Sequence, residues 1–387
     1  MRNIFLNWQM NNTFGWGILG FNLFSQFVKV PDVRPLMGVA IDDLDLVMVD
    51  PLRRGAILSA MMESNQFLAT MKRDSGGMAR IKGTVIDSLG DDVRGNDVHG
   101  QSNIGRIVYA DTRLPDAKQA LSRYDALLCG SAWNAQCLRA ATGREVKVIL
   151  EGVDTSLFCP GTRSGVLDPG KFYIFTGGKI EARKGQDLTL MAFRAFSARH
   201  PDAVLVTSWQ SPWPQWAAGF KGRLEHGVKL SGNGTVDVKA WARDNGVDPN
   251  KVIDLGHIPN QMMPTVLRDI DVCLQPSRAE PCTSLPVKEA MACGAPVIAA
   301  ANTGMLDILT SENSIALKHQ APVPGAGTEG WGESSVDEIV EALEWVYRNR
   351  AKARLLGRRA AQWIVDERRT WQAHADDLLG WIQATFP

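Results

Sequence analysis

Short apolar runs alternate with helical patterns along almost the whole chain, and this rhythm constrains the fold more than any other feature. Helical patterns such as residues 54–73 and 133–142 separate several of the runs. Strands that alternate with helices form parallel sheets wrapped by helices. The sequence therefore predicts an α/β fold with two doubly wound parallel sheets, built from residues 4–8, 34–41, 84–89, 106–110, 126–131 and 146–150, and from 172–178, 203–209, 251–258, 271–277, 295–300 and 314–318.

Length and local composition divide the chain into domains. Its 387 residues exceed the ~250 to 300 at which a single core usually stops growing. Residues 151–171 interrupt the strand rhythm with Gly, Pro and polar residues, which is typical of a linker. The last ~50 residues show helical patterns alone. We expect a first domain over 1–155, a second over 156–365 and a terminal helix over 366–387.

The charge balance and cysteine pattern exclude several classes of protein. Lys and Arg together number 42, as do Asp and Glu, so no basic surface for nucleic acid is expected. No window reaches the ~18 apolar residues of a membrane span, and the first apolar run breaks too early for a leader. Six scattered cysteines form no C-x-x-C pair. We expect a cytoplasmic protein without structural zinc, and peripheral membrane contact stays open.

The most informative stretch is residues 271–304, "DVCLQPSRAEPCTSLPVKEAMACGAPVIAAANTG". A strand ends in a loop that carries Arg278 and Glu280, and a helix begins near Ser284 and runs through Glu289. Free N–H groups at a helix start, aided by the helix dipole, bind phosphate. Glu289 lies a turn further in, where it can accept hydrogen bonds from ribose hydroxyls. This stretch predicts a nucleotide site.

A second stretch, residues 175–193, supplies positive charge. Lys179 and Lys184 lie in and just after a glycine-rich loop that contains Gly178 and leaves the first strand of the second domain. Cations placed there can neutralise a departing diphosphate. An ordinary solvated lysine is the alternative for each residue alone, but the neighbouring helix start favours the site.

These segments resemble the donor domain of retaining GT-B glycosyltransferases, in particular glycosyltransferase family four. The chain is similar to that family's first-strand loop, with lysine in place of the usual arginine, and it matches the linker pattern "GVD…F.P" and the signature "PS..E…EAMA.G.PV". Glu280 and Glu289 are separated by eight residues, one more than is common in the family. The matching residues are Gly178, Lys179, Lys184 and Gly185; Gly152, Val153, Asp154, Phe158 and Pro160; and Pro276, Ser277, Glu280, Glu289, Ala290, Met291, Ala292, Gly294, Pro296 and Val297.

The resemblance implies two Rossmann-like domains that face an interdomain cleft, with the C-terminal helix returning to the first domain. It implies metal-independent transfer, with retained configuration, of a sugar from a UDP- or GDP-linked donor to a hydroxyl of a saccharide, lipid-linked or other glycan acceptor, with no cofactor. Lys179, Lys184 and Glu280 would be catalytic. Donor-binding residues would be Gly15, Gly17, Gly178, Arg278, Cys282, Thr283, Ser284, Leu285, Glu289, His257 and Ile258.

The first half contains a competing signal. Gly15, Gly17 and Gly20 have the G-x-G-x-x-G spacing of a dinucleotide site, and Asp42 follows at roughly the distance of a ribose ligand. This pattern supports an NAD-dependent oxidoreductase as an alternative. Six residues, "QMNNTF", separate the strand from Gly15, however, and a compact dinucleotide turn has no such insertion. We therefore expect Gly15 and Gly17 to form the far wall of a sugar-transfer site.

Other first-half residues are weaker candidates. Asp43 and Asp45 have D-x-D spacing but lie far in sequence from the donor motifs, so we expect a solvated loop and no metal. Residues 105–140 resemble a subset of the same family through Arg113, Pro115, Ser131, Trp133 and Asn134. Asp111 and His99 become candidate contacts to acceptor or sugar. A further alternative is a non-catalytic binding protein with a GT-B fold.

Overall fold

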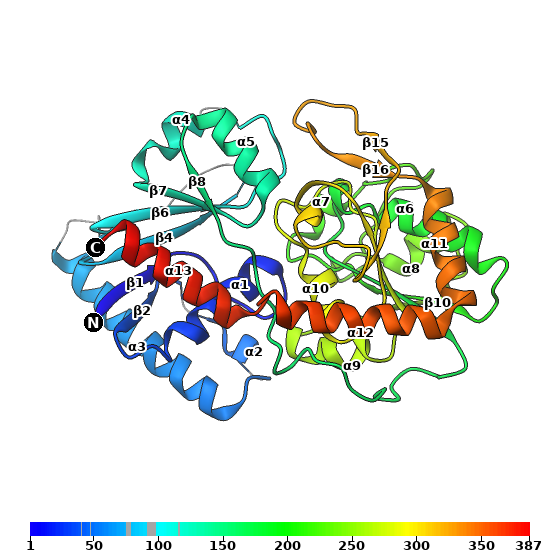
Figure 1. Cartoon of the computed structure of the whole chain (residues 1–387), viewed down its shortest axis with the longest axis horizontal. Helices are drawn as coiled ribbons and strands as arrows, with labels where there is room; N and C mark the ends of the chain where they lie inside the picture. Colours follow the sequence, from blue (N-terminus) through cyan, green and yellow to red (C-terminus); the bar gives the residue numbers. More distant parts are fainter. Residues whose placement is uncertain (40, 47, 75–78, 91–97, 115–116) are drawn as a thin grey trace. The chain divides into compact units, whose positions relative to one another are not determined.

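The computed structural model describes residues 1–387 apart from 40, 47, 75–78, 91–97 and 115–116. It divides the chain into two compact units (Figure 1). The first unit holds residues 1–154, 259–261 and 369–387, and the second holds 155–258 and 262–368. Each unit is built around its own six-stranded sheet, as the strand rhythm of the sequence predicts.

The sheet of the first unit is entirely parallel and has the order β2-β1-β4-β6-β7-β8. Strand β4 matches the predicted run, whereas β6 begins four residues before its predicted start. Polar Asn103 and the small Gly105 dilute the apolar signal there, although most of the strand is buried. The strands are β1 (Arg2–Leu6), β2 (Val33–Met37), β4 (Thr84–Leu89), β6 (Ser102–Ile107), β7 (Ala126–Cys129) and β8 (Val146–Val148), beside a small sheet of β3 (Ala79–Arg80) and β5 (Val98–His99).

The sheet of the second unit is also entirely parallel, in the order β11-β10-β9-β12-β13-β14. In chain order this is 3-2-1-4-5-6, the arrangement of dinucleotide-binding Rossmann sheets. The strands are β9 (Phe172–Gly177), β10 (Ala203–Ser208), β11 (Val252–Asp254), β12 (Val272–Gln275), β13 (Val297–Ala300) and β14 (Ile315–Leu317). A hairpin of β15 (Gln320–Pro322) and β16 (Gly332–Ser334) follows; its strands are too short for a periodic signal.

Helices connect the strands and cover the sheets. The first unit contains α1 (Gly15–Phe27), α2 (Asp43–Leu46), α3 (Pro51–Asp74), α4 (Ala117–Ala120), η1 (Leu121–Arg123), α5 (Ala132–Thr142) and α13 (Trp371–Thr385). The second contains η2 (Ala182–Lys184), α6 (Gln186–Ser197), α7 (Pro214–Ala217), α8 (Val238–Asp244), η3 (Pro249–Lys251), α9 (Met263–Leu267), α10 (Leu285–Ala292), η5 (Thr303–Asp307), α11 (Val336–Arg348) and α12 (Arg350–Asp366); η4 spans Asn260–Met262.

Alternate strand residues build the core of the second unit. Phe172, Ile174 and Leu205 join one buried cluster with residues of α6 and α11, such as Phe193 and Leu343. Helices α6 and α11 pack against each other, while α10 packs with α9 and α12. Helices cover both faces of this sheet, so side chains on both faces are buried. The strand sequences are therefore continuous apolar runs rather than alternating patterns.

The last helix returns to the first unit, as the sequence predicts. Helix α13 lies against α1, and both belong to that unit (Figure 1). Thr370 caps α13 by accepting a hydrogen bond from the N–H of Ala373 at 3.1 Å. Trp371, Leu378 and Ile382 of this helix are at most 3 % exposed. Their burial makes α13 a structural part of the first unit.

The substitution Leu378→Ala is expected to destabilise the protein by about 2–5 kcal/mol, because it leaves a cavity under a completely buried side chain. Gln383→Ala on the exposed face of the same helix is the matched control and is expected to change the free energy of unfolding by less than about 0.5 kcal/mol. Urea denaturation of both variants tests the packing of α13. Equal midpoints for the two variants would contradict it.

Among the described residues, no helix combines the length and the apolar character needed to span a membrane.

Candidate active site

The candidate site lies where the strand order of the second sheet reverses. Strands β9 and β12 are neighbours, yet the chain continues from β9 towards β10 on one side and from β12 towards β13 on the other. In such sheets the loops after the two strands diverge and leave a crevice at the carboxyl edge, where ligands bind. The loops at this edge are residues 178–185 and 276–284, the two stretches that the sequence singles out.

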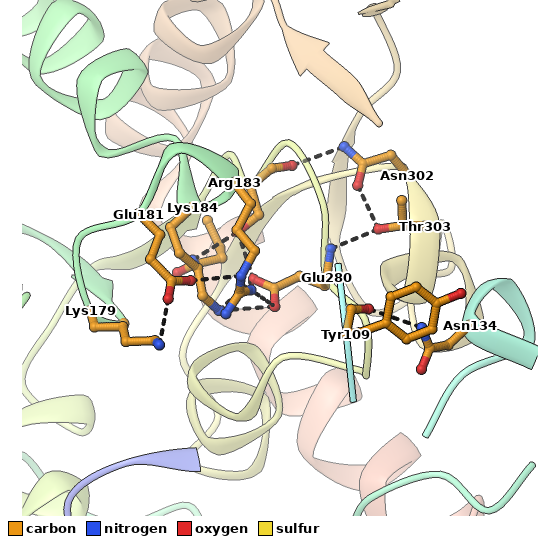
Figure 2. Close-up of polar contacts among 12 residues, drawn as sticks. Tyr109, Asn134, Lys179, Glu181, Arg183, Lys184, Glu280, Asn302 and Thr303 are labelled. Carbon is orange, nitrogen blue, oxygen red and sulfur yellow. Dashed lines mark hydrogen bonds and ion pairs between the residues drawn. The ribbon is translucent and has the colours of Figure 1, made fainter. Parts of the chain in front are cut away.

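Glu280 is the centre of a polar cluster that joins the two loops (Figure 2). Its carboxylate oxygens accept hydrogen bonds from Lys184 Nζ at 2.8 and 2.9 Å, and one of them accepts from Arg183 Nη1 at 3.2 Å. Ser277 Oγ donates to the other oxygen at 2.7 Å. The cluster therefore brings together Lys184 and Glu280, 96 residues apart in sequence.

Charge and burial oppose each other at this cluster. Lys184 is 8 % exposed, and its burial and the nearby charge of Arg183 lower its pKa despite the attraction of Glu280. Burial of Glu181 on its own would raise the pKa of that carboxyl, but Arg183 and Lys179 outweigh it and hold the pKa below its usual value. Three cations face two carboxylates, so the cluster has an excess of positive charge that suits an anionic ligand.

Lys179 is held at the rim of the cluster. Its ammonium forms an ion pair with Glu181 and lies 5.1 Å from the centre of the Trp213 ring. Trp213 in turn stacks on Trp216, which is 70 % exposed. Residues 208–241 contain four tryptophans, which form two pairs. Trp209 and Trp241 are core residues in edge-to-face contact, whereas Trp213 and Trp216 offer an aromatic surface beside Lys179.

Gly185 fixes the turn that carries Lys184. Its φ is +69°, in the left-handed region, and a Cβ would overlap the carbonyl oxygen of Pro276 on the β12 loop. A residue with a side chain would therefore meet both backbone strain and a collision. The glycine in "RKG" lets the two loops of the site approach each other.

The variant Gly185→Ala is expected to lose more stability than Gly143→Ala. Both glycines have nearly the same φ, +69° and +70°, but the space around Gly143 is open. The control loses about 1–2 kcal/mol from the left-handed conformation alone, and Gly185→Ala adds the displacement of the β12 loop. Thermal unfolding of both variants measures the difference. Equal losses would show that the two loops are not in close contact.

The loop before α10 presents backbone donors, as the sequence predicts for a phosphate site. Ser284 has a φ of +38° and is the residue before the helix. Among the described residues, the N–H groups of Ser284 and Leu285 and the hydroxyl of Ser284 have no hydrogen-bond partner in the protein. Thr283 is buried and accepts a hydrogen bond from Lys288 Nζ at 2.7 Å. The strained loop therefore leaves donors available at a helix start.

The other predicted donor contacts are placed as follows. Glu289 lies one turn into α10 and is 5 % exposed; Cys282 is buried in the loop before that helix. Gly178 is the first residue of the loop after β9 and has a φ of +106°. His257 and Ile258 follow the edge strand β11, where His257 is exposed. Their contacts with a donor stay predictions.

Arg278 is fully engaged by protein groups. Its guanidinium forms a bidentate pair with Asp187 at 2.7 and 2.9 Å, and its Nε donates to Glu333 at 2.7 Å. The residue is 5 % exposed. These contacts tie the β12 loop to α6 and to the β15/β16 hairpin, which gives Arg278 a structural function; its contact with a donor stays a prediction.

Sequence reasoning missed three groups around Glu280. Arg183 precedes Lys184 in "ARKG", so the sequence shows its charge but not that its side chain is directed to Glu280. Thr303 accepts a hydrogen bond from the backbone N–H of Glu280 at 2.8 Å, and it also donates to Asn302 at 3.0 Å (Figure 2). Gly304 donates its N–H to the Glu280 carbonyl at 3.0 Å. The "ANTG" sequence after β13 is the signal that could have indicated these contacts of Thr303 and Gly304 with Glu280.

The glycine-rich segment of the first unit is the start of α1. Strand β1 ends at Leu6 and the helix begins at Gly15, so the intervening loop is longer than predicted. The side chain of Asn11 fills the space beside Gly17 and accepts hydrogen bonds from the N–H groups of Thr13 and Phe14 at 3.0 Å. A helix that follows such a loop lacks the compact turn of a dinucleotide site. The role of Gly15 and Gly17 at a sugar site stays a prediction.

The D-x-D string differs from its prediction. It lies in the short helix α2 rather than in a loop, and Asp45 is not simply solvated. Its carboxylate accepts a hydrogen bond from the N–H of Asn12 at 3.0 Å, and burial raises its pKa. Asp45 therefore stabilises the loop before α1. Among the described residues, no group of three or more His, Cys, Asp or Glu side chains is arranged to hold a metal.

The remaining first-unit candidates have local contacts. Asp111 pairs with Arg113, whose hydrogen bonds to the carboxylate lower its pKa. His99 lies in β5, paired with Arg80 of β3. Asn134 donates from its side chain to the carbonyl of Tyr109 at 3.0 Å (Figure 2). Contacts of Asp111 and His99 with a substrate stay predictions, and Pro115 lies outside the described residues.

The six cysteines are all free thiols. Cys273 and Cys293 are buried, and burial raises the pKa of both, to about 12 for Cys293. Neither is a thiolate near neutral pH, so they act as packing residues.

The parallel sheet of order 3-2-1-4-5-6 places the second unit in the Rossmann-like class, and cations and free helix N–H groups lie at its switch point. The first unit repeats the parallel-sheet architecture, so the chain has the two-sheet GT-B type of fold. The family described as glycosyl transferases group 1 matches residues 162–363, which is 202 of 387 residues. The chain belongs to this family.

Individual relatives agree with this assignment. A D-inositol 3-phosphate glycosyltransferase of Segniliparus rotundus is 28% identical over 71% of this chain and 55% of its own length. Two of the curated relatives match about 70% of this chain, and the chain spans only about half of their length. Among solved structures, a sucrose-phosphate synthase of Thermosynechococcus elongatus has a TM-score of 0.69 at 16% identity, covering 100% of this chain and 99% of its own. HepE of Anabaena, in complex with UDP and glucose, has a TM-score of 0.65 at 13% identity over 99% of this chain and 100% of its own.

Proposed function

We propose that the chain is a retaining glycosyltransferase that moves a sugar from a UDP- or GDP-linked donor to an acceptor hydroxyl without a metal or other cofactor. The observation that carries this proposal is the cluster at the β9/β12 switch point. There Lys179, Lys184 and Arg183 lie on one loop, and the free N–H groups of Ser284 and Leu285 lie on the other. Membership of the glycosyl transferases group 1 family supports it.

The chemistry assigns a role to each group. The bond between the anomeric carbon and the diphosphate oxygen breaks, and negative charge grows on the leaving diphosphate. Lysine ammonium groups and backbone N–H donors stabilise that charge more strongly in the transition state than in the ground state. The acceptor oxygen forms the new bond on the same face and gives its proton to the departing phosphate, so this step requires no dedicated base. Glu280 orients the donor sugar and Glu289 binds the ribose.

The relatives suggest which compounds to try first. UDP-glucose is the first donor because HepE is described in complex with UDP and glucose, and D-inositol 3-phosphate is the first acceptor because curated relatives carry that name. GDP-linked donors and saccharide or lipid-linked acceptors complete the panel. We expect a donor that releases its nucleoside diphosphate slowly in water and faster with the correct acceptor. A panel in which no donor is consumed or bound would contradict the proposal.

A second candidate function is binding without catalysis. The observation that favours it is the saturation of Glu280, whose carboxylate is held by Lys184, Arg183 and Ser277. A binding protein would take up a nucleotide sugar without breaking it down, and calorimetry beside the hydrolysis assay separates the two functions. The NAD-dependent alternative predicts quenching of nicotinamide fluorescence on titration, which we do not expect.

A further inference from the structure

The second unit contains a cavity of about 360 Å³ that the proposed reaction does not use. Its lining includes Asp271 and Pro296, which come directly before β12 and β13. In a parallel sheet this is the amino edge, opposite the carboxyl edge that carries the candidate active site. We call it the arginine cavity because its charged lining consists of Arg163, Arg268, Arg350, Arg354, Arg358 and Asp271.

Positive charge dominates the arginine cavity. Five arginines and one aspartate give a formal charge of +4. Arg163 pairs with Asp271 at 2.8 Å, whereas Arg268 donates to the neutral carbonyls of Leu157 and Cys159 at 2.9 Å. The cavity thus contains more guanidinium charge than the protein neutralises there.

The three arginines on α12 differ in how far their charge is compensated. Arg350 lies over the rings of Phe172 and Tyr347, at 5.0 and 4.9 Å, and is 3.6 Å from Asp202. Within the described part of the chain, Arg354 and Arg358 have no ion pair or hydrogen bond from their side chains. Like charges spaced four residues apart on a helix repel one another. Arg354 and Arg358 therefore repel each other weakly at these exposed positions, and a bound anion would offset that repulsion.

Close packing holds α12 over the arginine cavity. A Cβ at Gly357 would overlap the carbonyl oxygen of Gly294, at the end of α10. Arg354 and Arg358 flank this contact point, and Gly294 lines the cavity together with Cys293. The Cys293 thiol, with its pKa raised by burial to about 12, adds no negative charge. The glycine contact thus fixes the position of the helix that carries Arg354 and Arg358, whose own side chains are exposed at the cavity.

We propose that the arginine cavity is a binding site for a small phosphate-bearing anion. Guanidinium groups bind phosphate oxygens through two parallel hydrogen bonds, and five arginines line this cavity. The volume lies at the lower end of the ~300 to 1,000 Å³ range of ligand pockets, which fits a phosphorylated small molecule or a single phosphate headgroup rather than a polymer. This inference goes beyond the proposed function and does not depend on it.

The test is a calorimetric titration of the full chain with inorganic pyrophosphate. The double variant Arg354→Ala/Arg358→Ala removes two uncompensated guanidinium groups. The matched control, Lys352→Ala/Arg359→Ala, removes the same charge from exposed positions of α12 that do not line the cavity. We expect the cavity variant to lose a binding step, with its Kd raised at least tenfold, and the control to bind as the wild type does.

Two results would overturn the proposal. A cavity variant that binds pyrophosphate in the same number of steps and with the same Kd values as the wild type would place all of the binding elsewhere, including at the active site. Equal weakening in both variants would show a general effect of charge. The melting temperature without anion checks the fold: relief of repulsion predicts that the cavity variant melts at or above the wild-type temperature.

A second arm identifies the source of the phosphate. Vesicles of phosphatidylcholine with and without phosphatidylglycerol are sedimented with the same three proteins. Binding to the anionic vesicles that depends on Arg354 and Arg358 would indicate a lipid headgroup. Pyrophosphate binding without vesicle binding would indicate a soluble phosphorylated compound, and binding to neither probe would refute the site.

Discussion

Replacing Lys184 by alanine is expected to lower turnover of the nucleotide-sugar donor by roughly 10²- to 10³-fold, the range seen when one preorganised donor of charge stabilisation is removed. Lys184 is the most buried cation of the cluster and lies 2.8 Å from Glu280. Because Lys184 is buried, a cation from solvent cannot readily take the place of its ammonium group in the alanine variant. Initial rates of nucleoside diphosphate release at saturating donor measure the effect.

A matched control distinguishes this loss from a general effect of charge. Lys239 lies on the exposed face of α8, and Lys239→Ala removes the same charge from the same unit. We expect the control to retain full turnover. Turnover of Lys184→Ala within twofold of the wild type would remove this lysine from the mechanism.

The variant Glu280→Gln is expected to lose about 3–5 kcal/mol of stability at neutral pH. The glutamate is 3 % exposed and is the shared acceptor of Lys184 and Arg183, so its removal leaves buried cations without a counter-charge. Glu225→Gln, at an exposed position, is the control and should behave as the wild type. Urea denaturation at pH 7 compares the two.

The stability deficit of Glu280→Gln should shrink as the pH rises. Burial already lowers the pKa of Lys184 in the folded protein below its ordinary value of 10.5. Between the folded pKa of Lys184 and 10.5 the unfolded chain binds more protons than the folded protein, so stability rises with pH across this window and is lost as the pH falls through the folded pKa. Loss of Glu280 lowers that pKa further and widens this window. Denaturation at pH 7 and pH 9.5 tests the sign, and a deficit that is equal at both values would contradict it.

The sequence predicts the sheets well because buried parallel strands are apolar on both faces. Strands β9, β10 and β12 each lie inside the predicted runs. The predicted start of β6 was four residues too late because Asn103 and Gly105 are not apolar, although the strand is mostly buried. The β15/β16 hairpin was missed because three-residue strands show no period.

Most residues of the candidate site could be predicted from the sequence, but the contacts between them could not. Lys184 and Glu280 were found through spacing and family resemblance, yet their direct contact depends on loops 96 residues apart. The hydrogen bond from Glu280 to Thr303 depends on the order of the strands, which no local pattern encodes. The same limit applies to Arg278, whose partners Asp187 and Glu333 come from distant elements.

The glycine spacing near the N-terminus shows how a motif can mislead. Gly15 and Gly17 fit a dinucleotide fingerprint in sequence, but the fingerprint requires a strand that runs almost directly into the first glycine. Here eight residues separate Leu6 from Gly15, and Asn11 occupies the space beside Gly17. The glycine spacing does not encode this loop, whereas the six-residue insertion before Gly15 indicated it, and the structure extends the loop to eight residues.

The most direct test of the account is a crystal structure of the chain with UDP or GDP bound. We predict that the diphosphate lies within hydrogen-bond distance of Lys184 Nζ and of the N–H groups of Ser284 and Leu285, with the ribose near Glu289. A nucleotide found instead with its phosphates against the Gly15–Gly17 segment, and with the β9/β12 loops unoccupied, would contradict the account.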